Sequence, residues 1–143
     1  MSDLGVRPGT ADGVLTMPVD TDADVVKVRQ AVRGLTQQAR LSLVDQTKFV
    51  TAASELARNT LVHGGGGHVE AQVVSEGRRT GVRAVFVDDG PGIADIDLAM
   101  TDGWTSGTGL GLGLSGSRRL VERFVIDSAP GAGTRVEIVS WSR

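Results

Sequence analysis

Clusters of glycine separate this chain into segments that can form helices and strands, and no other residue type marks these boundaries as clearly. The sequence has 20 glycines, most of them gathered at residues 64–67, 90–92, 103–116 and 131–133. Because glycine has no Cβ, it adopts backbone conformations that other residues avoid, and it weakens the interior of a helix or strand. Helices and strands are therefore expected between these clusters. The clusters themselves either only turn the chain or also hold a ligand.

Hydrophobic spacing predicts one strand and two helices in the first half of the chain. Val14–Val19 is expected to be a short strand, and a helix follows with Thr21 or Asp22 as its N-cap. The apolar positions of this helix form one buried stripe, namely Val25, Val28, Val32, Leu35 and Ala39. A second helix, over about residues 42–62, has a broader apolar surface, which suits a central helix lying on a sheet. It stops at the glycines 64–67.

The second half is predicted to be mostly strands. Residues 68–75 and 82–88 form two of them, joined by a turn at 76–81. A short helical segment near 96–100, a helix over 115–123, and strands over 124–128 and 134–141 around a turn at 130–133 complete the order. Such runs of helices and strands indicate an α+β two-layer sandwich, with a mixed β-sheet and helices on one face. Residues 1–12 are expected to be a flexible N-terminus and residues 13–143 a single domain.

Composition removes several classes of function. The formal net charge is -2, so there is no global electrostatic case for binding nucleic acid or an anionic membrane. The absence of cysteine excludes disulfides and thiolate metal sites. The two histidines, His63 and His68, lie in or beside a glycine cluster and are interpreted as turn residues, so zinc is not expected. We find no signal peptide and no apolar run near the roughly 20 residues that span a bilayer, so the cytoplasm is the expected compartment.

Glu55 and Asn59 lie four residues apart on the second predicted helix and project to the same side. One interpretation is a solvated helix edge with a Glu–Asn hydrogen bond. The other is chemical. An amide oxygen is a hard ligand of the kind that magnesium prefers. A carboxylate one turn away can accept a proton from a hydroxyl or from a metal-bound water.

Asp88 stands where the predicted strand ends, and Gly90 and Gly92 follow it. Alone, this pattern is a turn. The glycines would also let the backbone approach a flat ligand closely. The carboxylate could then accept a hydrogen bond from an exocyclic amine such as that of adenine.

A third motif covers residues 107–113, with the sequence Gly-Thr-Gly-Leu-Gly-Leu-Gly. Alternating glycines free successive N–H groups to point at an anion, and a helix starting near Ser115 would bring its positive dipole end close. The motif lacks the Gly-Lys-Ser/Thr of a Walker loop, and it does not follow a strand as a dinucleotide-binding fingerprint would. Arg118 and Arg119 are candidates for the γ-phosphate only because they are near this loop; a solvated helix face is the alternative.

Taken in this order, the three motifs resemble those of the GHKL ATPases, which include histidine-kinase catalytic domains, type II topoisomerase ATPase domains and anti-sigma kinases. Residues 55–59 resemble the N box, residues 88–92 the first glycine box and residues 107–113 the second. Gly133 and Thr134 resemble the last element of the pattern. The resemblance implies a Bergerat fold that binds magnesium and ATP.

The same resemblance implies a role for each matched residue. Asn59 would bind magnesium, Asp88 would read adenine, and Glu55 would be the general base for a hydroxyl nucleophile. The implied nucleotide-binding residues are Asn59, Asp88, Gly90, Gly92, Ile93, Gly107, Thr108, Gly109, Leu110, Gly111, Leu112, Gly113 and Thr134.

Within this group, residues 102–107 and 113–120 look like those of the RsbT-like switch kinases of the bacterial stressosome. Such kinases phosphorylate serine or threonine on STAS-domain proteins, are released by that step, and activate a PP2C-type phosphatase. Ser115 stands where those kinases tend to have proline. Residues 59–64 look more like the RsbW-type anti-sigma kinases, which bind a sigma factor and phosphorylate an anti-anti-sigma protein. A third hypothesis is a non-catalytic nucleotide-binding module that sequesters partners. The presence of Glu55 argues against it, because such a module needs no base.

Overall fold

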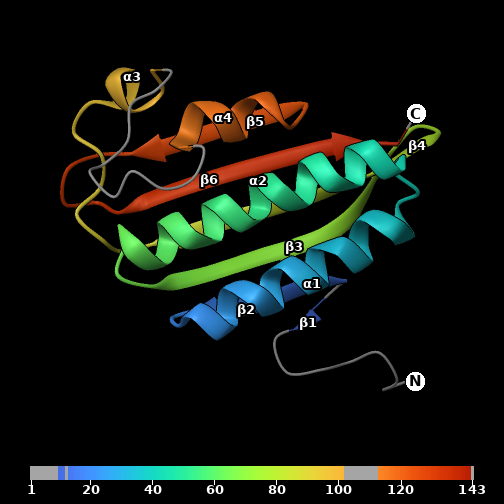
Figure 1. Ribbon diagram of the computed structural model, residues 1–143, viewed down its shortest axis with the longest axis horizontal. Coiled ribbons are helices and arrows are strands. Elements are labelled where there is room, and N and C mark those ends of the chain that lie inside the picture. Colours follow the sequence, from blue (N-terminus) through green and yellow to red (C-terminus); the bar gives the residue numbers. More distant parts are fainter. Residues whose placement is uncertain (1–9, 12, 102–112, 143) are drawn as a thin grey trace.

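Six strands form one sheet in the computed structural model, which describes residues 10, 11, 13–101 and 113–142 (Figure 1). Their spatial order is β1 (Thr10–Ala11), β2 (Val14–Val19), β3 (Gly67–Glu76), β4 (Arg79–Asp88), β6 (Thr134–Trp141) and β5 (Arg123–Ser128). Since β4 lies between β3 and β6, the residues at its end have a neighbouring strand on both sides.

Helices cover one face of this sheet. The long helices α1 (Asp22–Gln38) and α2 (Leu43–Val62) lie side by side in front of the strands in Figure 1. The shorter α4 (Gly113–Arg119) contacts α2, and the single turn α3 (Ile96–Ala99) contacts α4. These two layers confirm the predicted α+β sandwich with helices on one face.

The predicted mixed sheet is wrong, because every pairing among the described strands is antiparallel. One helix between two neighbouring strands would return the chain for a parallel strand. Here two helices that run in opposite directions connect β2 to β3, so β3 runs opposite to β2 (Figure 1). The β3–β4 and β5–β6 connections are hairpins, which are antiparallel by construction.

Both long helices begin at the residues that the sequence predicts. Thr21 is the N-cap of α1, and its hydroxyl accepts from the Asp24 N–H at 3.1 Å while the Asp24 carboxylate accepts from the Thr21 N–H at 3.2 Å. Ser42 caps α2 through the Asp45 N–H. The α1 helix ends at Gln38 with Ala39 as its C-cap, and the next residue, Arg40, has a positive φ of 62° that lets the chain reverse into α2.

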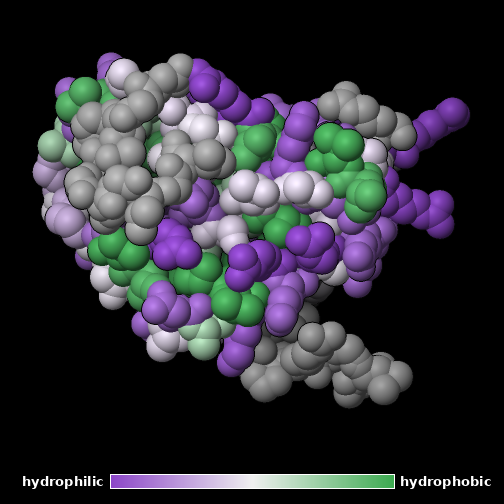
Figure 2. All heavy atoms as spheres, viewed as in Figure 1, coloured by the Kyte–Doolittle hydropathy of each residue, from purple (hydrophilic) through white to green (hydrophobic). Residues whose placement is uncertain are grey.

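The core lies between α1, α2 and the sheet. Phe49 and Leu56 of α2 belong to the same buried cluster as Val82 of β4 and Ile138 of β6, and all four are nearly inaccessible to solvent. The predicted α1 stripe is confirmed, with Leu35 half-buried against this cluster and its other members buried. Figure 2 shows the outer side of the helical layer, where hydrophobic residues form separate clusters among hydrophilic ones.

Two predicted boundaries are wrong. The β3–β4 turn is only Gly77 and Arg78, because the two strands keep pairing out to Glu76 and Arg79. The helix predicted over 115–123 begins earlier, at Gly113, and ends at Arg119. Beyond it the Glu122 N–H donates to the Val139 carbonyl at 3.1 Å, so pairing with β6 ends the helix and starts β5.

The strand β1 is an element that the sequence did not predict, and it pairs with β2 at Thr10↔Leu15 and Ala11↔Val14. The rest of the proposed flexible N-terminus lies outside the described residues, and the division into a terminus and one domain stays a prediction. Within the described part of the chain, no helix is long and apolar enough to cross a membrane.

Candidate functional site

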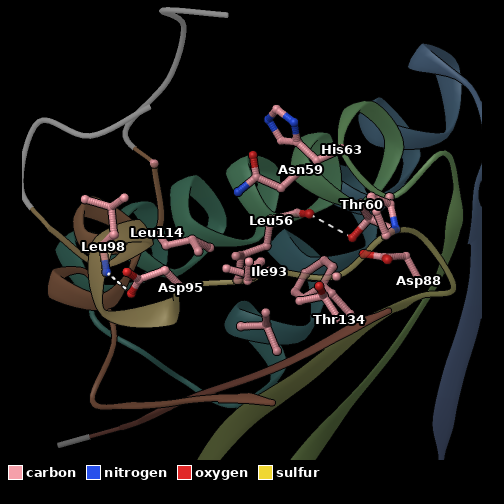
Figure 3. Close-up of a pocket in the computed structure, with 17 residues that line it drawn as sticks. Leu56, Asn59, Thr60, His63, Asp88, Ile93, Asp95, Leu98, Leu114 and Thr134 are labelled. Carbon is pink, nitrogen blue, oxygen red and sulfur yellow. Dashed lines mark hydrogen bonds between the residues drawn. The ribbon is translucent and has the colours of Figure 1, made fainter. Parts of the chain in front are cut away.

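A cavity of about 430 Å³ lies where α2 and β4 end and β6 begins. Figure 3 shows its labelled side chains: Leu56, Asn59, Thr60 and His63 come from the C-terminal half of α2, and Asp88 and Thr134 come from the sheet. The segment between β4 and α3 contributes Ile93 and Asp95, and α4 contributes Leu114. Apolar walls with a few polar groups are typical of a small-molecule site.

Asp88 is the last residue of β4, and its neighbours across the sheet are Gly67 of β3 and Thr134 of β6. Its Oδ1 accepts the Gly90 N–H at 2.9 Å, which closes a tight turn directly after the strand. Its Oδ2 accepts no hydrogen bond from the described residues. One carboxylate oxygen is thus occupied by the turn and the other is available to a ligand.

The carboxylate of Asp88 lies against the backbone of Gly64. A Cβ atom at position 64 would overlap the Asp88 Cγ and stand 2.5 Å from its Oδ2, so the site needs glycine there. Gly64 follows His63, the C-cap of α2, and the N–H groups of His63 and Gly64 both donate to the Asn59 carbonyl, at 2.9 and 3.2 Å. The end of α2 and the end of β4 therefore hold one another in place.

The β5–β6 hairpin supports the turn that follows Asp88. The Gly131 N–H donates to the Pro91 carbonyl at 2.8 Å, and the Ile93 N–H donates to the Ser128 hydroxyl at 2.9 Å. Gly92 has a positive φ of 77°, and a Cβ there would overlap the Ala129 carbonyl. The segment after Asp88 is thus fixed by neighbours at both ends.

Asn59 is half-buried and lines the cavity from α2. Its amide oxygen is a hard donor that suits magnesium, and its side chain makes no hydrogen bond to the described residues. Within the described residues no cluster of three or more His, Cys, Asp or Glu side chains could hold a metal by itself. A single amide oxygen fits an ion whose other ligands are phosphate oxygens and water.

Glu55 does not line this cavity. It lines a separate groove between α1 and α2, together with Arg29, Arg33 and Arg58 among others. Glu55 lies one turn before Asn59 on α2, which places the two residues about 6 Å apart along the helix axis. The structure therefore places the proposed base beside the cavity and not in it.

Apart from Glu55, the predicted site residues fall into four groups. The cavity brings together Asn59, Asp88, Gly92, Ile93, Gly113 and Thr134. Gly90 does not line it, but it donates the hydrogen bond that orients Asp88. Residues 107–112 lie outside the described residues, so their predicted contact with phosphates stays a prediction. Arg118 and Arg119 are exposed in the last turn of α4.

The interpretation of the histidines as turn residues is wrong for His68 and incomplete for His63. His68 lies within β3 and approaches Glu70 at 3.6 Å. His63 is the C-cap of α2 and lines the cavity.

Sequence reasoning missed several residues that build the site. Asp95 caps α3 by accepting the Leu98 N–H at 2.9 Å and is a second carboxylate on the cavity wall. Ser128 touches three parts of the site, yet no motif marks it. A turn at residues 130–133 places Ser128 opposite Thr134 if the flanking strands pair, but that turn does not indicate the contact of Ser128 with Ile93.

Comparisons with known proteins agree with this geometry. Residues 44–142 match the family described as histidine kinase-, DNA gyrase B-, and HSP90-like ATPases. The chain is 37% identical over 123 residues to the serine/threonine-protein kinase RsbT of Bacillus subtilis (strain 168), covering 86% of this chain and 92% of that protein. It is 28% identical over 113 residues to the anti-sigma F factor of Clostridium novyi (strain NT), covering 76% of this chain and 79% of that protein.

A solved structure shares the fold. The RsbU and RsbW domains of a Mycobacterium tuberculosis protein align with a TM-score of 0.62 and 22% identity. The alignment covers 91% of this chain and 33% of the longer one.

Proposed function

The chain belongs to the family of histidine kinase-, DNA gyrase B- and HSP90-like ATPases and is an RsbT-like serine/threonine-protein kinase, and we propose that it phosphorylates a STAS-domain partner. In this reaction it would transfer the γ-phosphoryl group of ATP to the partner. One observation carries the proposal. The cavity combines the carboxylate of Asp88, with one oxygen available, and the amide of Asn59 on the neighbouring helix. A site for magnesium and ATP needs one polar group that hydrogen-bonds to adenine and one that binds magnesium.

The adenine end of the site would lie at Asp88 and Thr134, which are paired across β4 and β6. The available Oδ2 of Asp88 would accept a hydrogen bond from the exocyclic amine of adenine. Leu56, Phe86 and Val136 line the cavity nearby and offer apolar surface for the base.

The phosphate end would lie toward Asn59 and the start of α4. Asn59 would hold magnesium, which when bound neutralises charge on the transferring phosphoryl group. Gly113, which lines the cavity, is the first residue of α4 and the last of the glycine loop. Residues 107–112 would cover the phosphates with backbone N–H groups.

Glu55 would accept the proton of the attacking hydroxyl. Its position in the groove between α1 and α2 supports this role, because the acceptor must approach from outside the nucleotide cavity. A nucleotide whose phosphates pass Asn59 would present its γ-phosphoryl group near Glu55, one helical turn away. The acceptor side chain would then enter from the groove, between the base and the phosphate.

The partner can be tested directly. The purified chain would be incubated with magnesium and ATP and with STAS-domain proteins encoded beside it, and each product would be examined by mass spectrometry. We expect one added phosphate on a serine or threonine, and none when magnesium is chelated. Bound ATP without any modified acceptor would support a sequestering module instead, and no ATP binding would refute the site.

The similarity to an anti-sigma factor favours a second candidate, in which the chain also binds a sigma factor. Both candidates share the phosphotransfer step, and they differ in the acceptor and in the protein held afterwards. Co-purification with a sigma factor in the presence of ATP, lost on addition of an unphosphorylated STAS protein, would support the second candidate.

A further inference from the structure

Ser128, at the end of β5, has an unusual number of polar neighbours for one hydroxyl. Its Oγ lies 2.9 Å from the Ile93 nitrogen, 2.8 Å from the Gly133 carbonyl oxygen and 2.8 Å from the Thr134 Oγ1. These partners belong to the turn after Asp88, to the β5–β6 hairpin and to the cavity wall.

The direction of each hydrogen bond follows from the number of protons available. The Ile93 N–H can only donate, so Ser128 accepts from it. The Gly133 carbonyl can only accept, so it takes the single proton of the Ser128 hydroxyl. The remaining contact with Thr134 then needs the proton of the Thr134 hydroxyl.

This arrangement fixes what Thr134 offers to a ligand. Because its proton points to Ser128, its Oγ1 presents only lone pairs to the cavity. Asp88, its register partner on β4, presents the Oδ2 of its carboxylate, which also accepts. This end of the cavity is therefore a surface of hydrogen-bond acceptors.

We propose that Ser128 is a specificity-determining residue that makes this site select purines with an amino group at position 6 over purines with an oxo group there. The inference rests on the proposed ATP site and deepens it. A 6-amino group donates to these acceptors, whereas a 6-oxo group puts an acceptor in its place. The N1–H of a 6-oxo purine lies one ring position away, so it meets these acceptors only if the base shifts in the cavity. Ser128 thus acts through Thr134, without touching the base.

A substitution at Ser128 separates this role from simple support of the loop. In Ser128→Ala the Thr134 hydroxyl is released from its acceptor and can rotate its proton into the cavity. The ratio of the GTP Kd to the ATP Kd, measured by calorimetry on the full chain, should fall by about tenfold, as expected for one hydrogen bond of changed polarity. Ser128→Thr keeps the hydroxyl and should keep the ratio. Ser75→Ala, on an exposed part of β3, is the matched control.

Equal weakening of ATP and GTP in Ser128→Ala, or an unchanged ratio, would show a purely structural role and overturn the inference. A second measurement needs no substitution. The unmodified chain should bind ATP more tightly than purine riboside triphosphate, which has hydrogen at position 6, and bind inosine triphosphate, with a 6-oxo group, the most weakly. Inosine triphosphate binding as well as purine riboside triphosphate would contradict an acceptor-only surface. Failure of ATP itself to bind would refute the proposed function and this inference with it.

Discussion

At the scale of single residues, Asp88 meets two demands at once. Its Oδ1 accepts the Gly90 N–H, and its Oδ2, which accepts no hydrogen bond from the described residues, would serve adenine. Asp88→Asn is therefore more than the loss of a charge. The amide oxygen would stay with the Gly90 N–H, and the NH₂ group would then point at the amine of adenine, donor against donor.

We expect Asp88→Asn to weaken ATP binding by at least about tenfold, because one hydrogen bond is lost and two donors are left facing each other. Isothermal titration calorimetry would measure this, with Asp127→Asn on the exposed side of β5 as the control. ATP affinity in Asp88→Asn equal to that of the control would contradict the adenine role.

Residue-level prediction from the sequence succeeded where a residue has a local reason for its position. Asp88 follows an apolar strand and precedes glycines, so its place at a turn was readable. Ser128 has no such signal, because its importance comes from Ile93, 35 positions away, and from the register of the β5–β6 hairpin. Glu55 was identified correctly as the helical neighbour of Asn59, but spacing alone could not show that it faces a different groove.

At the scale of elements, α1 carries a residue that weakens it. Gly34 lies inside the helix, its φ is not positive, and a Cβ there would have no heavy atom within 4 Å. Gly34→Ala should therefore stabilise the fold by about 1 kcal/mol, because alanine restricts the unfolded chain without a clash.

Urea denaturation followed by circular dichroism would test Gly34→Ala. The midpoint should rise with an unchanged slope. ATP affinity should not change, since Gly34 does not line the cavity. A lower midpoint would show that α1 needs glycine for a reason that its surroundings do not reveal.

Element boundaries were predictable where they depend on nearby residues. Thr21 and Ser42 cap their helices as their side chains suggest. The end of α4 was missed because it depends on the pairing of Glu122 with Val139 of β6. Because Glu122 and Val139 are far apart in the sequence, no local sequence pattern predicts their contact.

At the scale of the whole molecule, one acidic side chain links three strands. Glu137 of β6 forms ion pairs with Arg83 of β4 and, at 3.3 Å, with Arg123 of β5. Burial acts to raise the pKa of Glu137, but hydrogen bonds and charge from Arg83 and then Arg123 outweigh it, so the pKa lies below its usual 4.5. A lowered carboxylate pKa adds stability above the unfolded value, and this stability is lost as pH falls through the folded value.

The unmodified chain should therefore lose free energy of unfolding more steeply than Glu137→Gln as pH falls below the usual glutamate pKa of 4.5. Chemical denaturation at several pH values would compare the two proteins. The pKa of Asp24 is also lowered, first by the Asp20 N–H, but this effect is present in both proteins and cancels in the difference. Parallel pH profiles would show that the ion pairs do not contribute to stability.

The two-layer architecture was readable from the order of helices and strands, whereas the direction of the strands was not. The relative direction of β2 and β3 depends on whether the helices between them pass along the sheet once or twice. The short connection at residues 39–42 folds α2 back along α1, so the chain passes along the sheet twice and β3 runs antiparallel to β2. The site is assembled by this topology, since the ends of α2 and β4 meet only in the folded chain.

Phosphoryl transfer with Glu55 as the base can be tested by measuring single-turnover transfer from ATP to the STAS acceptor. Glu55→Gln should slow transfer by about 10²–10⁴-fold, as expected for loss of a general base, while ATP affinity stays within about twofold. Glu76→Gln, in the exposed β3–β4 hairpin, should behave as the unmodified chain. A transfer rate in Glu55→Gln equal to that of Glu76→Gln would show that Glu55 is not the base.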